Sequence, residues 1–289
     1  MRDDAREVLE RRLLGQVIDA GDTEGATMPV GMDQLTNDLT AETEVLRALL
    51  VGLPDADWEL ATPAEGWAVR DQISHLAYFD DAAVRSATDP DGFQAELRQL
   101  VQGGGISPDD IAARYRDLPP ARLLAWFDES RARLVSTFAA LEPGTRVPWY
   151  GPPMSAASSV TARLMETWAH GQDAVDGLGA GREPSQRLRH VAHIGVRAMP
   201  FSYALHGRQA PDTPVRVELT APGGELWSWG PEGAADLVRG PALDFCLLVT
   251  QRRHRDDLAL EVTGPVATEW LAIAQAFAGE PGKGRAPLT

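Results

Sequence analysis

The sequence predicts an α+β protein in which a helical bundle precedes a smaller mixed domain. Apolar residues recur at helical spacing from residue 33 to residue 177, whereas alternating segments typical of strands begin only at residues 215–219 and recur at 258–262. A glycine-rich stretch, 177–181, separates the two patterns. The 289 residues, 44% of them hydrophobic, suit two domains of ordinary size, each with its own core.

The first domain is expected to span residues 32–182 and to contain four long helices. Residues 33–53 form the first, and a helix that runs to about residue 87 forms the second. A third, strongly periodic helix starts at Pro119 or Pro120 and ends before Pro143, and the fourth contains the segment 165–170. The insertion 92–117 reads as two short helices around a glycine run at 103–105, which suits a lid more than a core. Residues 1–31 are interpreted as an N-terminal extension.

The second domain is expected to span residues 183–289 as an α+β module. Its predicted elements are a helix at 185–205, strands at 215–219, 225–230 and 258–262, and helices at 241–249 and 266–277. Cys246, the only cysteine of the chain, lies in an apolar segment and is interpreted as a small buried residue.

The charge of the chain excludes several classes of partner. A formal net charge of −15 argues against nucleic acids and anionic membranes, because both require a basic surface, and favours small-molecule partners. No apolar run approaches about 18 residues and no secretory signal is evident, so a cytoplasmic location is expected. Lys283 is the only lysine, and this arginine-rich composition indicates a GC-rich, actinobacterial genome. A homodimer is compatible with these features.

Three residues form the candidate site. Glu166 and His170 are four positions apart and therefore stack on one face of a helix, roughly 120° or more from the apolar stripe of that helix. His75 lies at the margin of the apolar face of the second helix, from which a side chain can point between helices. A Glu-His pair at this spacing is also common on exposed helices, so spacing alone leaves that alternative open.

Two imidazoles and one carboxylate would leave an open position on a divalent metal ion, as in catalytic rather than structural zinc sites. An ion of this kind binds water or a thiol and lowers its pKa. Nickel, iron and manganese accept the same ligands, although zinc is favoured.

The segments Gly66-Trp67-x-Val69-x-Asp71-x-x-x-His75-Leu76 and Glu166-x-x-x-His170-x-x-Asp173 resemble the metal-binding motifs of the DinB-like superfamily, closest to its mycothiol-dependent maleylpyruvate isomerase branch. The resemblance covers roughly residues 33–180. It implies a four-helix bundle that binds a divalent metal through His75, Glu166 and His170, followed by an α+β domain distantly similar to sterol-carrier folds.

The resemblance also implies a function. The protein is expected to be a thiol-dependent isomerase or S-transferase that uses mycothiol or a similar thiol, with an electrophilic small molecule as substrate. A small-ligand carrier and an interaction protein with a structural metal remain the alternatives.

Further residues are candidates for supporting roles. Asp71 and Asp173 each lie within one turn of a ligand histidine, and at least one is expected to accept the ring N–H that does not face the metal. Trp149 and Tyr150 are expected either to form a wall of the substrate pocket or to pack over a bundle end, and Arg163 is a candidate for binding substrate. The pair His190 and His193 is expected to pack in a core or interface rather than to bind a second metal.

Overall fold

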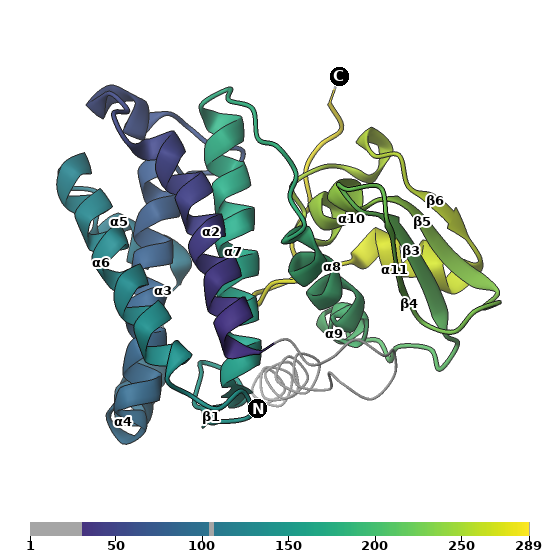
Figure 1. Ribbon diagram of the computed structural model, residues 1–289, viewed down its shortest axis with the longest axis horizontal. Coiled ribbons are helices and arrows are strands. Elements are labelled where there is room, and N and C mark those ends of the chain that lie inside the picture. Colours follow the sequence, from purple (N-terminus) through teal and green to yellow (C-terminus); the bar gives the residue numbers. More distant parts are fainter. Residues whose placement is uncertain (1–30, 104–106, 289) are drawn as a thin grey trace. The chain divides into compact units, whose positions relative to one another are not determined.

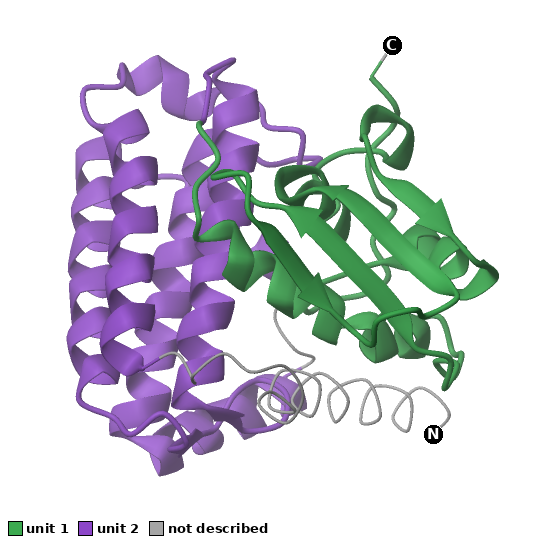
Figure 2. Cartoon of the chain, turned by 45° about the vertical axis from the view of Figure 1, so that its right-hand side comes forward, with its two compact units in different colours: residues 1–29, 183–289 green, residues 30–182 purple. Residues whose placement is uncertain are grey.

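A computed structural model describes residues 31–103 and 107–288 of the chain. The described residues fall into two compact units, 31–182 and 183–288 (Figure 2). Most of the predicted extension 1–31, and two glycines of the run 103–105, lie outside the described residues. The fold is α+β, as the sequence predicts.

The first unit is a bundle of four long helices (Figure 1). Helix α3 packs against α6 and α7, and α2 packs against α7 and α6. The bounds of the bundle helices are α2 Met32–Leu50, α3 Val69–Thr88, α6 Pro120–Ala139 and α7 Ala156–Gly177. The insertion between α3 and α6 forms α4 Pro90–Gln102 and α5 Pro108–Arg114, and a 3-10 turn, η1 Asp55–Glu59, precedes α3. The predicted four-helix bundle is therefore confirmed.

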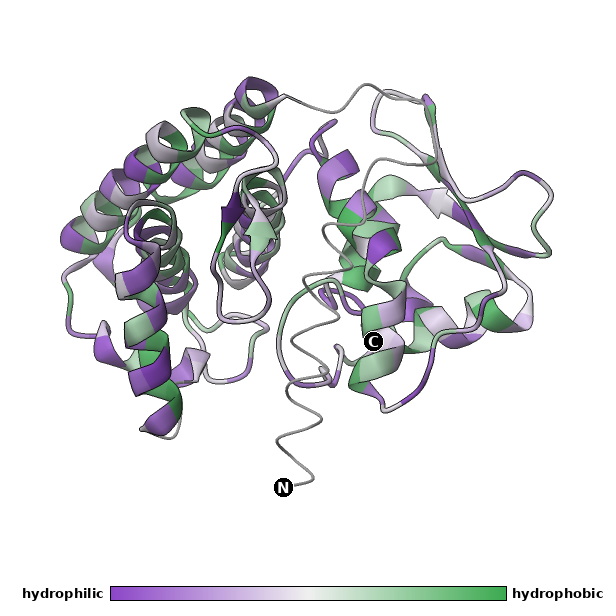
Figure 3. Ribbon diagram, turned by 90° about the horizontal axis from the view of Figure 1, so that it is seen from below, coloured by the Kyte–Doolittle hydropathy of each residue, from purple (hydrophilic) through white to green (hydrophobic). Residues whose placement is uncertain are grey.

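The apolar faces of these helices form the bundle core. Hydrophobic and hydrophilic residues alternate along the helices (Figure 3), as expected for helices with one face toward a core and the other toward water. One core cluster joins α2, α3, α6 and α7 and contains Leu46, Leu50, Trp58, Val69, Ile73, Leu76, Ala77, Leu123, Phe127 and Ala174. Burial of this apolar cluster helps to hold the four helices together.

A buried ionic network also crosses the bundle. The carboxylate of Asp80 on α3 is fully buried and accepts hydrogen bonds from Arg131 on α6 over 2.7 Å and from Arg163 on α7 over 3.0 Å. Arg131 donates further to Thr43 and, over 3.0 Å, to Thr167, while Arg163 donates to the carbonyl of Leu76 over 3.3 Å. The network therefore fixes the relative positions of α3, α6 and α7.

A short strand pair precedes α7. Strands β1 Arg146–Val147 and β2 Met154–Ser155 are antiparallel and enclose the loop that carries Trp149 and Tyr150. The side chain of Ser155 then caps α7 by accepting a hydrogen bond from the backbone N–H of Ser158 over 3.1 Å.

The second unit contains a four-stranded sheet in the order β4-β3-β5-β6. Strands β3 and β5 are parallel and central, and the two outer strands are antiparallel to their neighbours. The bounds are β3 Val215–Thr220, β4 Leu226–Trp229, β5 Asp236–Pro241 and β6 Glu261–Thr263. Helices α10 Ala242–Val249 and α11 Pro265–Ile273 both contact β5. The sequence analysis did not predict β5.

The single helix predicted at 185–205 is wrong, because the structure has two helices there. Helix α8 Leu188–Arg197 ends at Ala198, and α9 Met199–Leu205 follows directly. Pro200 has no backbone N–H and cannot continue the hydrogen-bond ladder of α8, but it is tolerated in the first turn of a new helix. Within the described residues, no helix is long and apolar enough to cross a membrane.

Candidate metal centre

The segment before α3 determines where His75 is placed. Gly66 has a φ of +77°, which suits glycine, and this turn lets Ala61 and Ala68 pair as an isolated antiparallel bridge. Asp71 then caps the helix, because its carboxylate accepts a hydrogen bond from the backbone N–H of Ala68 over 2.9 Å. His75 follows in the second turn of α3.

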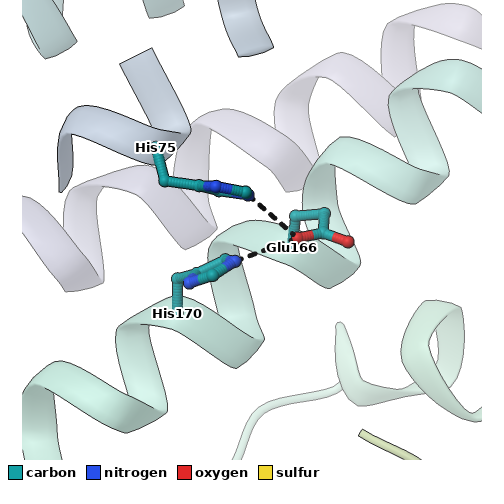
Figure 4. Close-up of side chains that lie close together, drawn as sticks. All are labelled: His75, Glu166 and His170. Atoms are coloured by element: carbon teal, nitrogen blue, oxygen red, sulfur yellow. Dashed lines mark hydrogen bonds and ion pairs between the residues drawn. The ribbon is translucent and has the colours of Figure 1, made fainter. Parts of the chain in front are cut away.

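Helices α3 and α7 bring the three predicted ligand residues together (Figure 4). Glu166 Oε2 lies 3.1 Å from His170 Nε2 and 3.7 Å from His75 Nε2. One ligand atom from each residue lies within 4.8 Å of the other two, and the two imidazole ring centres are 4.3 Å apart. In the part of the chain that the structure describes, no other group of three histidine, cysteine, aspartate or glutamate side chains is arranged this closely.

The electrostatics of the cluster favour the ionisation states that metal ligands need. Burial, followed by the neighbouring His170, lowers the pKa of His75 to about 4, so this ring is neutral at pH 7. Burial alone would raise the pKa of Glu166, but hydrogen bonds from His170 and His75 outweigh it and lower that pKa well below its usual value. A neutral imidazole and an ionised carboxylate are the forms that bind a divalent cation.

The Nδ1 atoms of His75 and His170, which do not face Glu166, have different surroundings. His170 Nδ1 lies 2.5 Å from Oε1 of Gln72, which is fully buried on α3. His75 Nδ1 is buried and has no hydrogen-bond partner among the described residues. The inner Nε2 atoms of both rings approach the same oxygen of Glu166. Two nitrogens and one carboxylate oxygen that converge in this way fit a divalent ion such as zinc.

Aromatic rings surround the cluster. The ring of Trp67 lies 5.4 Å from that of His75 and 6.0 Å from that of His170, and the ring of Phe79 lies 4.6 Å from that of His75. Trp149 and Tyr150 pack against Phe79 at 6.2 Å and 5.6 Å. The ring of Phe79 therefore lies between His75 and the two predicted wall residues.

Asp71, Asp173 and Arg163 are the remaining residues that the sequence suggested for supporting roles. Asp71 binds the N–H of Ala68 and the guanidinium of Arg116, so its carboxylate is engaged at the start of α3 rather than at a histidine ring. Asp173 is buried on α7, less than one turn after His170. Arg163 is also buried, and it donates hydrogen bonds to Asp80 and to the Leu76 carbonyl.

The histidines of α8 belong to the other unit. His193 Nδ1 accepts a hydrogen bond from Trp229 Nε1 over 3.3 Å, and neither His190 nor His193 belongs to the metal-ligand group. Gln72 was not predicted from the sequence as part of the site. Gln72 lies three positions before His75, a spacing that puts both on one face of α3 and would have been the signal for it.

The family model for the mycothiol maleylpyruvate isomerase N-terminal domain matches residues 39–175, which reach from α2 to α7 and include the three clustered residues. The bundle belongs to this family. The DinB-like resemblance predicted from the sequence is thereby confirmed for the bundle. A second family model, described as wyosine base formation, matches residues 211–261 in the other unit.

The chain is also similar to individual proteins and to solved structures. Uncharacterized proteins from two strains of Mycobacterium tuberculosis are each 46% identical over 248 residues, which cover 86% of this chain and 96% of the relative. These mycobacterial relatives support the actinobacterial origin expected from composition. The crystal structures of the mycothiol-dependent maleylpyruvate isomerase and of a histidine-to-alanine variant have TM-scores of 0.54 with this chain. They are 19% and 18% identical and cover 80% of this chain and 93% of their own, which shows a shared fold.

Proposed function

We propose that the bundle binds one divalent metal ion, with zinc favoured, through His75, Glu166 and His170, and that the ion activates mycothiol or a similar small thiol. The observation that carries the proposal is the convergence of three ligand atoms within 4.8 Å, together with the pKa shifts of His75 and Glu166 toward their metal-binding forms. The family of the bundle and the name of the structural neighbours support a thiol as the second component.

The ligand set indicates what a bound ion would contribute. A divalent ion held by two neutral imidazoles and one carboxylate supplies a Lewis acid with an open position, which lowers the pKa of a thiol that binds there. Glu166 contributes the only negative charge of the ligand set. Trp67 and Phe79 cover the histidine rings and exclude water from them, which strengthens electrostatic interactions within the site.

The sulfur nucleophile has to come from outside the chain. Cys246 is the only cysteine, and it lies fully buried on α10 of the other unit, where burial raises the pKa of its thiol well above the usual value. The proposed reaction is attack of an external thiolate on an electrophilic carbon of a small substrate, and it ends either in an isomer or in a thiol conjugate.

The proposal is tested with cobalt in place of the native metal. Addition of mycothiol is expected to produce a sulfur-to-cobalt charge-transfer band in the near ultraviolet, and His170→Ala is expected to abolish it. His193→Ala, a histidine variant in the other unit, serves as the control and should keep the band. Thiol binding by calorimetry without this band would place the sulfur away from the metal, and the absence of thiol binding would favour a carrier.

Turnover is a separate measurement. Maleylpyruvate is the first electrophile to test, because the structural neighbours carry it in their name. Isomerisation that requires both the thiol and the metal would support an isomerase, whereas consumption of the thiol in equal amounts with the substrate would support a transferase.

A further inference from the structure

A chain of hydrogen bonds leads from the backbone before α3 to the ring of His170. The hydroxyl of Thr62 donates to the carbonyl oxygen of Trp67 over 2.8 Å, and the side-chain N–H of Gln72 donates to Thr62 Oγ1 over 2.9 Å. The other end of the same amide, Gln72 Oε1, lies 2.5 Å from His170 Nδ1. Three side chains from the loop, α3 and α7 are therefore connected in series.

The direction of this chain follows from its first member. A backbone carbonyl only accepts hydrogen bonds, so the single proton of the Thr62 hydroxyl is used on Trp67, and the hydroxyl oxygen is left to accept from Gln72. A side-chain amide has one donor end and one acceptor end, so the oxygen of Gln72 is the end that faces His170. The Nδ1 atom of His170 must then carry the proton.

We propose that Gln72 and Thr62 are positioning residues that hold His170 in the Nδ1–H tautomer, so that its Nε2 lone pair faces the metal. The tautomer of a histidine ligand is set by the hydrogen bond at its other ring nitrogen. The inference deepens the proposed function, on which its metal-binding part rests. The tautomer itself is a property of the metal-free chain and is measured independently.

The chain of hydrogen bonds is anchored at both ends. Thr62 also donates its backbone N–H to the carbonyl of Trp67 over 2.8 Å, next to the bridge between Ala61 and Ala68. A Cβ at Gly177, the last residue of α7, would lie 2.9 Å from the carbonyl oxygen of Ala61 and 3.1 Å from a methyl carbon of Thr62. The loop therefore lies directly on the helix that carries His170, and the fully buried Gln72 is shielded from competing water.

The two ligand histidines differ in this respect. His75 Nδ1 is buried without a hydrogen-bond partner among the described residues, so no group at that nitrogen holds the orientation of its ring. His170 is the pre-organised ligand of the pair. Variants in the chain of hydrogen bonds are therefore expected to change the tautomer of His170 and to leave that of His75 unchanged.

The first test is nitrogen NMR of metal-free protein labelled with ¹⁵N-histidine, recorded at mildly alkaline pH. Nδ1 of His170 is expected to be protonated in the wild type, whether or not Nε2 also shares a proton with Glu166, and to lose that proton in Gln72→Met, which removes the acceptor at similar side-chain length. Gln172→Met is the matched control, because Gln172 is a buried glutamine of α7 whose amide donates to Asp176. An unprotonated Nδ1 in the wild type, or no change at Nδ1 in Gln72→Met, would overturn the inference.

The second test is zinc affinity, measured by competition with a chromophoric chelator. Gln72→Met and Thr62→Val are expected to weaken zinc binding by about 10 to 100-fold, the usual effect of losing such a partner. Thr62→Ser keeps the hydroxyl and should restore the wild-type value, which a purely structural role of the methyl group would not predict. Equal affinity in all variants contradicts the inference. If the wild type binds no zinc, the proposed function fails, and the NMR result still decides the tautomer.

Discussion

Replacement of Asp80 by asparagine should destabilise the bundle more than any comparable change on its surface. The variant keeps the size of the side chain but removes the negative charge that faces Arg131 and Arg163 at 2.7 Å and 3.0 Å. The three side chains are at most 6% exposed, so water cannot replace the lost partner. Two guanidinium groups would then remain buried without a carboxylate.

The size of the effect follows from this burial. Removal of one partner from a buried ion pair typically costs about 3–5 kcal/mol, because the other charge stays desolvated. For a unit of about 150 residues, each kcal/mol lowers the melting temperature by about 2–4 °C, so a decrease of roughly 6–20 °C is expected. Asp81→Asn is the matched control. Asp81 pairs with Arg133, both are 40–50% exposed, and loss of such a pair costs about 0–1 kcal/mol.

The assay is urea unfolding of metal-free full-length protein, followed by tryptophan fluorescence and circular dichroism, together with zinc affinity. Because Asp80 connects α3 to α7, Asp80→Asn should weaken zinc binding as well as stability, whereas Asp81→Asn should change neither appreciably. Equal stability of the two variants would refute the reasoning that the network fixes the helices around the site.

The remaining predictions concern the site itself. His75→Ala, Glu166→Ala and His170→Ala should each remove most bound zinc in metal analysis, whereas His193→Ala should retain it; full occupancy in the His75 variant would exclude that ligand. Because the pKa of His75 is lowered to about 4, the unfolded chain takes up a proton first as pH falls from 6.5 to 4. Metal-free wild type should lose about 3 kcal/mol of stability across this window, and His75→Gln should not, which urea unfolding at several pH values would reveal. Trp149→Ala should weaken mycothiol binding in calorimetry without changing zinc affinity, and a loss of zinc instead would assign Trp149 to the bundle fold.

Features that depend on the residues of a single helix were predicted correctly from the sequence. The periodicity of residues 33–53, and of the segment from Pro119 or Pro120 to Pro143, predicts helices whose bounds agree with the structure within a few residues. The spacing of Glu166 and His170 correctly puts both side chains on one face of α7. The position of His75 beside them was inferred from family resemblance, because spacing within one helix carries no information about the neighbouring helix.

The features that the sequence analysis missed depend on contacts between elements. Arg163 shares a face with Glu166, which suggested substrate binding, but the buried charge of Asp80 on another helix determines its position. Gln72 lies at Nδ1 of His170, and its orientation depends on a loop oxygen ten residues earlier. Strand β5 was missed, although it is central in its sheet, because residues 236–241 lack the alternating pattern of an exposed strand.

Gly177 has no side chain, but Ala61 and Thr62 lie so close to it that a substitution at this position is expected to affect the site. A larger residue there would push against Ala61 and Thr62 and move the loop away from the end of α7. Among related sequences, a conserved His-Glu-His set would then be an insufficient criterion for equal metal affinity. A homologue that keeps all three residues but has a bulky residue at this position is expected to bind metal more weakly.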